Sequence, residues 1–232
     1  YFPMYRASKI DLLSALQTSD YDSIVAKALR DRAVVNHLIR FAYDKETLVG
    51  WRAIVALGRV ARELVRRDHE FLRNTCRKLL WSLNDESGGI GWAAPELLGE
   101  IVSADPPRFS DMIPIIAGIY EIEEDVFRSG VLYALYCIAE TAPELVAPYR
   151  EIMMKALADS SPMVKVRGIA LIGRIWSWIR KHELWSEEYL KIIMSVLEKN
   201  RTDKSEVWVY EIDCFTAHEV GDDATTLLKT IY

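Results

Sequence analysis

The amino-acid sequence predicts an all-α protein, a right-handed α-solenoid of about five to six helical-hairpin repeats. Three observations predict this fold class. An apolar pattern recurs at intervals of roughly 40 residues, each copy has the periodicity of an amphipathic helix, and a second amphipathic segment lies between consecutive copies. A pair of helices that repeats along the chain is the signature of a helical solenoid. We therefore expect residues 1–232 to form a single repeat domain.

The repeat is defined by apolar residues that recur in register. Five segments align on a central position held by Leu57, Leu98, Leu135, Ile172 and Phe215, at spacings of 41, 37, 37 and 43 residues. The position eight residues earlier holds Val49, Ile90, Phe127, Val164 and Val207. The position three residues later holds Val60, Ile101, Ile138, Ile175 and His218. Residues at these offsets share one face of an α-helix, so each segment predicts a helix that buries this face.

The aligned segments predict the second helix of each repeat near residues 45–64, 87–103, 124–141, 161–180 and 204–220. Asp44, Asp85 and Asp159 each precede the central position by 13 residues, in the turn that opens the helix. Ser161 and Pro162 are typical of an N-cap followed by the first helical residue. Amphipathic segments such as "EEYLKIIMSVLEK" lie between these helices and predict the first helix of each pair.

The repeated pattern is Asp-x4-Val-x2-Arg/Trp-x2-Ala-x2-Ala-Leu-Gly, seen best in "DKETLVGWRAIVALG" and in Asp159 with the "SSPMVKVRGIALIG" that follows it. It resembles HEAT repeats, especially the short type named after phycobilisome lyases, over residues 20–225. The segment "LNDESGGIGWAAPE" is similar to one in uncharacterised prokaryotic HEAT-repeat proteins. The resemblance implies the solenoid fold and a concave binding face lined by the second helices. It implies no particular activity, because such arrays serve many functions.

The segment "ESGGIGWAAPELLGEI", residues 86–101, departs from the regular repeat. Pro95 takes the register position held elsewhere by Ile54, Leu132, Ile169 and Ile212. A proline inside a helix leaves the carbonyl four residues earlier, here that of Gly91, without its donor, so we expect a kink. Gly88, Gly89 and Gly91 allow a close approach of backbone or ligand. Two interpretations stay open: the kink sets the curvature of the array, or it opens a groove for a partner.

The expected binding surface lies on the concave face of the second helices. Trp51 and Trp92 share a register position, so neighbouring helices would place them about 10 Å apart. The candidate binding residues are Trp51, Arg52, Arg59, Gly91, Trp92, Glu96, Glu100, Arg167 and Arg174. Tryptophan and arginine are enriched at interface hot spots, which favours a protein partner. In the alternative interpretation the tryptophans are buried and the charges form salt bridges between helices.

Charge is distributed unevenly along the chain, whose net charge is −5. Residues 1–82 carry 15 basic and 9 acidic side chains, a surplus of +6. Residues 83–160 carry 4 and 14, a surplus of −10, and residues 161–232 carry 10 and 11. This charge dipole would orient a protein partner by electrostatic complementarity. The acidic middle would repel a nucleic-acid duplex laid along the array, so nucleic acid is the less favoured partner.

Two enzymatic functions are the alternatives to a binding protein. Three histidines precede glutamate, His69, His182 and His218, and such pairs resemble those that bind two irons in deoxyhypusine hydroxylase. They fall at different repeat positions here, so we expect no convergent metal site. The basic first third and Glu96 beside Trp92 resemble features of the HEAT-like alkylpurine DNA glycosylases, in which an acid acts near an aromatic side chain. The acidic middle opposes that interpretation.

The remaining sequence features favour an interaction protein. No apolar run is long enough to span a membrane, and there is no nucleotide-binding loop, HExxH motif or catalytic-triad order. Cys76, Cys137 and Cys214 are widely spaced within mostly apolar stretches, which predicts buried thiols in a reducing cytoplasm. We therefore expect a cytoplasmic, non-catalytic scaffold, without cofactor or metal, that binds another protein.

Overall fold

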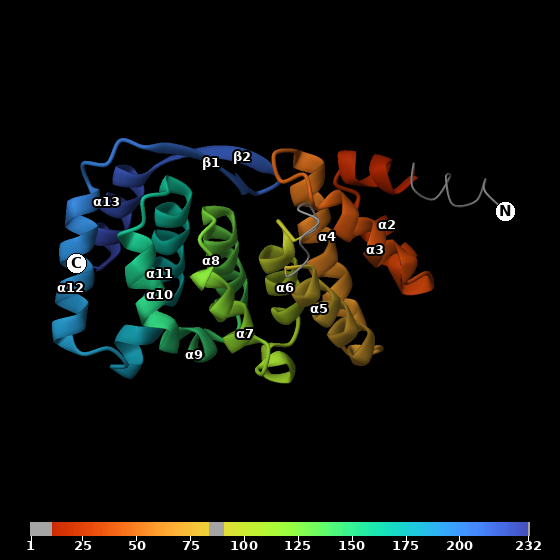
Figure 1. Ribbon diagram of the computed structural model, residues 1–232, viewed down its shortest axis with the longest axis horizontal. Helices are drawn as coiled ribbons and strands as arrows, with labels where there is room; N and C mark the ends of the chain where they lie inside the picture. Colours follow the sequence, from red (N-terminus) through yellow and green to blue (C-terminus); the bar gives the residue numbers. More distant parts are fainter. Residues whose placement is uncertain (1–10, 84–90, 232) are drawn as a thin grey trace. The chain divides into compact units, whose positions relative to one another are not determined.

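The computed structural model describes residues 11–83 and 91–231 (Figure 1). The chain is mostly helical, as its apolar periodicity predicts, and the described residues also contain a two-stranded sheet. These residues fall into two compact units. The first comprises the chain up to Asp105 together with Tyr210–Cys214, and the second comprises Pro106–Val209 and the chain from Phe215 onward. No helix in the described ranges is long and apolar enough to cross a membrane.

The first unit is built around α4 (Leu48–Leu64). The helices that pack on it are α2 (Tyr21–Arg30), α3 (Ala33–Phe41), α5 (His69–Ser82) and α6 (Ala94–Val102) (Figure 1). Residues 11–17 are also helical. Thr47 caps α4, because its hydroxyl oxygen accepts a hydrogen bond from the amide of Gly50 at 3.1 Å. Leu57 and Val60, two of the predicted core positions, are fully buried.

The second unit is built around α11 (Pro162–His182). Its other elements are η1 (Pro106–Phe109), α7 (Ile113–Gly118), η2 (Ile119–Glu121), α8 (Asp125–Ala139), α9 (Pro143–Val146), η3 (Ala147–Tyr149), α10 (Arg150–Leu157), α12 (Glu187–Asn200) and α13 (Val220–Ile231). Helices α8, α10 and α13 pack on α11. Ser161 takes the N-cap position with extended backbone, although its side chain makes no capping hydrogen bond.

Residues 204–220, where the repeat pattern predicts a helix, form a β-hairpin instead. Strand β1 (Glu206–Glu211) pairs with β2 (Cys214–Glu219). Val207, Trp208 and Val209 are β-branched or aromatic and favour a pleated strand over a helix. Ile212 and Asp213 form a two-residue turn with φ of 46° and 67°, the signs that a type I′ hairpin turn requires. The helix prediction was therefore wrong here.

Helix α13 takes the place in the packing that was expected for residues 204–220. It contacts both α11 and α12, as the second helix of a further repeat would. The hairpin thus lies between α12 and α13 in the chain. His218 lies on β2 and not in a helical core, and Cys214 on the same strand is exposed, whereas a buried thiol was expected.

Helix α6 is shorter than the predicted 87–103 and it is not kinked. Residues 84–90, which include Gly88 and Gly89 of the predicted segment, lie outside the described residues. Pro95 is the second residue of α6, where the backbone N–H has no partner in any helix, so proline removes no hydrogen bond. The carbonyl of Gly91, predicted to lack a donor, accepts from the amide of Ala94 at 2.9 Å. Proline therefore starts this helix and does not bend it.

Candidate functional site

Trp51 and Arg52, two of the predicted binding residues, lie where α4 meets the turn of the hairpin, inside the first unit. Trp51 is only 7% exposed, and its indole stacks on the ring of Tyr210 with the centroids 5.4 Å apart and the planes 6° from parallel. Such offset stacking stabilises a pair by about 0.5–1.5 kcal/mol beyond simple burial. The structure therefore places Trp51 in an internal contact and not on an open face.

Four side chains converge on the carboxylate of Asp213 in the hairpin turn. Arg52 Nε, the Tyr21 hydroxyl and the Tyr210 hydroxyl each donate to Oδ1 at 2.9 Å, and the Ser19 hydroxyl donates to Oδ2. We call these five residues the clasp. Ser19, Tyr21 and Arg52 come from the first part of the chain, and Tyr210 and Asp213 come from the hairpin, about 160 to 190 residues later. The clasp thereby fixes the hairpin turn on α2 and α4.

The arginine of the clasp is held on a second side by the backbone. Its Nη1 donates to the carbonyl oxygens of Leu16 at 3.2 Å and Gln17 at 2.7 Å, and its side chain is 13% exposed. Arginine suits this position because its planar fork can serve several acceptors at once. Arg52 is therefore a structural residue whose donors are used internally.

The clasp shifts the pKa values of its members in opposite directions. Burial alone would raise the pKa of Asp213, but the hydrogen bonds from Ser19, Tyr21, Tyr210 and Arg52 outweigh it and lower the pKa to about 2. Burial raises the pKa of the Tyr21 and Tyr210 hydroxyls, and the neighbouring Asp213 carboxylate adds to the rise. At neutral pH the clasp thus pairs one carboxylate with one guanidinium and two protonated phenols.

Backbone strain is concentrated at the clasp. Of the four non-glycine residues with positive φ in the described part of the chain, three lie here: Ser19, Ile212 and Asp213. Ile212 is the most unfavourable of them, because a β-branched side chain crowds the backbone at positive φ. It is also 98% exposed, so its apolar surface is not compensated by burial. Neither property stabilises the fold.

Replacing Ile212 with asparagine should raise the free energy of unfolding by about 1 kcal/mol. Asparagine tolerates positive φ and is preferred in the first position of a type I′ turn, so the substitution relieves strain without removing a buried contact. Denaturant unfolding of the two proteins measures the change. The matched control is Ile192→Asn, an exposed isoleucine within α12, which should not gain stability. A loss of stability in Ile212→Asn would show that the turn is not strained.

The acidic candidates of α6 are buried. All nine residues of this helix are buried, and the helix packs against α4 and α5. Glu96 and Glu100 therefore do not face solvent. Glu96 Oε1 accepts a hydrogen bond from Lys45 Nζ at 2.7 Å. The Glu100 carboxylate lies against Gly58, where an added Cβ would stand 1.8 Å from Oε2. Glu96 is thus an enclosed, ion-paired residue and not an acid open to a DNA base, which weighs against the glycosylase interpretation.

Trp92 and Gly91 lie before α6, whereas Arg59 lies on α4 beside Tyr21 of the clasp. Trp92 is 38% exposed in the turn before α6, and Gly91 is buried against the end of α5, where an added Cβ would lie 3.0 Å from the carbonyl oxygen of Ser82. Arg59 is exposed, and its guanidinium lies 4.2 Å from the centre of the Tyr21 ring. Trp51 and Trp92 therefore differ in burial, and together they do not form an exposed aromatic pair.

Arg167 and Arg174 belong to the second unit, on α11. The Arg167 guanidinium is buried and lies 5.0 Å from the centre of the Tyr133 ring. Arg174 is exposed, and its guanidinium lies 4.1 Å from the centre of the Tyr136 ring and 4.0 Å from the Glu140 carboxylate. These cation–π contacts join α11 to α8. The buried cation Arg167 serves packing, and Arg174 is accessible.

The structure gathers no metal site from the described residues, since no group of three or more potential ligands forms there. His69 starts α5 in the first unit. His182 Nδ1 is hydrogen-bonded to the carbonyl of Trp178 at 2.8 Å, and His218 Nδ1 lies 2.9 Å from Asp223 Oδ2. His182 and His218 thus have different partners within the second unit.

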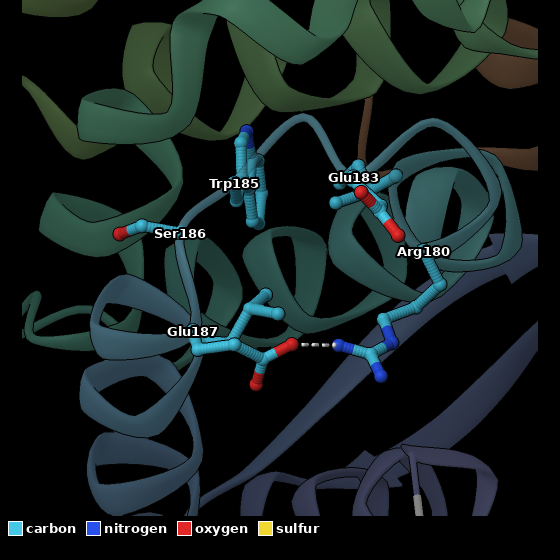
Figure 2. A pocket seen from close by; sticks show the side chains of 7 residues that line it. Arg180, Glu183, Trp185, Ser186 and Glu187 are labelled. Carbon is cyan, nitrogen blue, oxygen red and sulfur yellow. Dashed lines mark hydrogen bonds and ion pairs between the residues drawn. The ribbon is translucent and has the colours of Figure 1, made fainter.

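Described residues of the second unit line two cavities. The larger, of about 360 Å³, lies between the end of α11 and the start of α12. Figure 2 shows Arg180 and Glu187, two of the lining residues, paired with nitrogen and oxygen 2.9 Å apart, and the Trp185 ring, which also lines the cavity. Trp185 Nε1 donates to the carbonyl of Ala147 at 3.2 Å. The smaller, of about 270 Å³, is lined by α11, α13 and His218. Among the described residues, neither lining brings together a convergent set of catalytic groups.

The exposed face of α5 lies outside the predicted binding surface, which comprised only the second helices. Glu70, Asn74, Arg77, Lys78 and Trp81 are exposed and share one stripe of this helix. Trp81 is 79% exposed. Arg77 donates to Glu70 Oε1 at 2.9 Å and to Asn74 Oδ1 at 2.7 Å, which orders the stripe beside the indole. We call these five residues the α5 surface. The sequence could have indicated this surface, because Trp81 falls on the polar side of an amphipathic helix.

Comparison with known proteins adds information on the fold alone. No protein-family model matches the chain, and no curated protein matches it. The chain is similar to three engineered proteins solved by crystallography as Northeast Structural Genomics Consortium targets. For target OR366 the TM-score is 0.58 at 15% identity, covering 100% of this chain and 93% of that one. For OR329 the TM-score is 0.56 at 17% identity, and the match covers 97% of this chain and 89% of that one. For OR497 the TM-score is 0.54 at 18% identity, and the match covers 88% of this chain and 49% of that one, so the chain spans about half of OR497.

Proposed function

We propose that this protein is a non-catalytic, cytoplasmic scaffold of HEAT-like repeats that binds another protein through the α5 surface. The observation that carries the proposal is Trp81, a large aromatic side chain exposed beside Arg77 and Lys78. Tryptophan and arginine are the residue types most enriched among interface hot spots. An exposed indole of this kind costs solubility and contributes no packing to the fold.

The packing of the helices supports the solenoid part of the proposal. In the first unit α4 contacts α2 and α6, and in the second unit α11 contacts α8 and α13, so alternate helices form a layer within each unit. Helices α3 and α5 cover the first layer, and α10 and α12 cover the second. Two layers of alternating helices are the arrangement of a helical repeat array.

The mixed charge of the α5 surface favours a protein over a nucleic acid. Glu70 lies within the stripe and pairs with Arg77, and Glu63 stands at the end of α4 next to Arg67 at 3.9 Å. These ion pairs leave the stripe only a small net positive charge, which is less than the many phosphate contacts of nucleic-acid binding require. A protein partner can supply both signs of charge and an apolar pocket for the indole.

Replacing Trp81 with alanine should weaken partner binding at least about tenfold, because truncating a hot-spot tryptophan typically costs about 2 kcal/mol or more. The measurement is quantitative affinity capture from a nuclease-treated lysate of the source organism. Trp208→Ala is the matched control, since Trp208 is 66% exposed on β1 and outside the α5 surface. Equal recovery of every captured protein by Trp81→Ala and the wild type would contradict the proposal.

A further inference from the structure

The charges of the α5 surface restrict which partner it fits. Arg77 is partly neutralised by Glu70, whereas Lys78 forms no ion pair within residues 11–83 and 91–231. Arg66 and Arg67 are exposed in the connection that leads into α5, and Arg67 lies 3.9 Å from the Glu63 carboxylate. The surface therefore combines an apolar centre, Trp81, with a surplus of positive charge. Its complement is a surface with an apolar centre and a surplus of negative charge.

The chain itself carries such a complement in its second unit. Five acidic residues and no basic residue lie between Arg108 and Arg128. Four of the five form one stretch with an exposed apolar neighbour, and we call the set the acidic surface: Ile115, Glu121, Glu123, Glu124 and Asp125. Ile115 is exposed on α7, and the elements that bear these residues, α7, η2 and α8, pack against one another.

The acidic surface keeps most of its charge. Glu121 pairs with Lys155 at 2.8 Å, but both side chains are more than half exposed, and such surface pairs interact weakly. Glu123, Glu124 and Asp125 are exposed at the start of α8, where the helix dipole stabilises their negative charge. The three adjacent carboxylates thus present negative charge at the start of α8, where the Arg128 guanidinium donates to the Glu123 carbonyl and pairs with Asp159.

We propose that the α5 surface of one copy of this chain binds the acidic surface of a second copy. This inference rests on the proposed function, since it names the partner of the same surface. Trp81 of one copy would pack on Ile115 of the other, while Lys78 and Arg77 face the carboxylates at positions 121–125. Because the two surfaces differ, the contact is heterologous: one copy keeps an unused acidic surface and the other an unused α5 surface. Association then grows with concentration beyond the dimer unless the rotation closes a ring.

The test is sedimentation velocity of the full chain across a concentration series. We expect the mean mass to rise with concentration at low salt and the apparent Kd to weaken at least tenfold in about 1 M salt, where the Debye length falls from about 10 Å to about 3 Å. Lys78→Glu and Glu123→Lys/Glu124→Lys should each be monomeric over the same series, because each places like charges opposite one another. Lys191→Glu, the same charge change on exposed α12, is the control and should associate as the wild type does.

Mixing the two charge-reversed proteins provides the decisive measurement. One protein retains a native acidic surface and the other a native α5 surface, and their altered surfaces are again complementary. The mixture should therefore regain association that neither protein shows alone. A wild type that stays monomeric throughout the series, or a mixture that stays monomeric, overturns the proposal. If in that case Trp81→Ala still loses a captured protein, the α5 surface binds a different partner and only the self-association is wrong.

Discussion

Replacing Lys45 with methionine is expected to lower the free energy of unfolding by about 3 kcal/mol, because it leaves the buried Glu96 carboxylate without its countercharge. The side chain of Glu96 is 3% exposed and that of Lys45 15% exposed. Among the described residues, Glu96 Oε2 is buried without a hydrogen-bond partner, so the carboxylate depends on Lys45 alone. Urea unfolding followed by circular dichroism measures the difference.

A second variant separates the ion pair from simple packing. Lys45→Met combined with Glu96→Met should recover most of the lost stability, since a buried ion pair replaced by apolar side chains of similar volume is often neutral. Lys155→Met is the matched control, because it breaks an exposed pair with Glu121 and should cost less than about 1 kcal/mol. Similar losses in Lys45→Met and Lys155→Met would show that the buried pair has no special role.

Replacing Asp213 with alanine should cost about 3 kcal/mol as well, because the variant leaves the largely buried Arg52 guanidinium and two phenol hydroxyls without their common acceptor. Combining it with Arg52→Met should cost less than the sum of the two single changes, since the residues share one network. Glu206→Ala, which removes an exposed carboxylate from the same hairpin, serves as the control. Additive losses in the double variant would contradict the clasp.

The clasp also predicts the direction of a pH dependence. The pKa of Asp213 is about 2 in the folded protein against 3.8 for the ordinary side chain, so the unfolded chain binds this proton more tightly. Its contribution to stability is therefore complete above about pH 4 and is lost as the pH falls through about 2. Asp203, held by Lys165 and Ser205, has a similarly lowered pKa and acts in the same window. Asp213→Asn should reduce the acid-dependent loss of stability without abolishing it.

The sequence by itself determines the positions of the long helices. Helices α4 and α8 lie within the predicted segments 45–64 and 124–141, and α11 covers nearly all of the predicted 161–180 before ending at His182. A helix that buries one side must repeat apolar residues every three or four positions. This spacing is the same whichever element packs against the helix, so it can be read from the sequence alone. Pro95 could also have been assigned from sequence, because proline is as typical of a first helical turn as it is disruptive later.

The hairpin shows where a local pattern is ambiguous. Val207, Cys214 and Phe215 fit the apolar positions of a helix when aligned with the repeats, yet the β-branched and aromatic residues between them favour a strand. A short apolar segment satisfies both periodicities, and the choice is made by what it packs against. In this protein the turn between the strands is fixed by Ser19, Tyr21 and Arg52, which precede it by 161 residues or more.

Which polar residues are buried was decided only by the tertiary structure. Trp51, Arg52 and Glu96 have the composition of an interface hot spot, but each is used inside the first unit, by Tyr210, Asp213 and Lys45 respectively. Trp81, on a helix of ordinary polar pattern, is by contrast exposed to solvent. Apolar periodicity predicts which side of a helix is buried, because burial of apolar area selects apolar residues on that side. It cannot report which distant side chain satisfies a charge, since that depends on contacts that form only when the chain is folded.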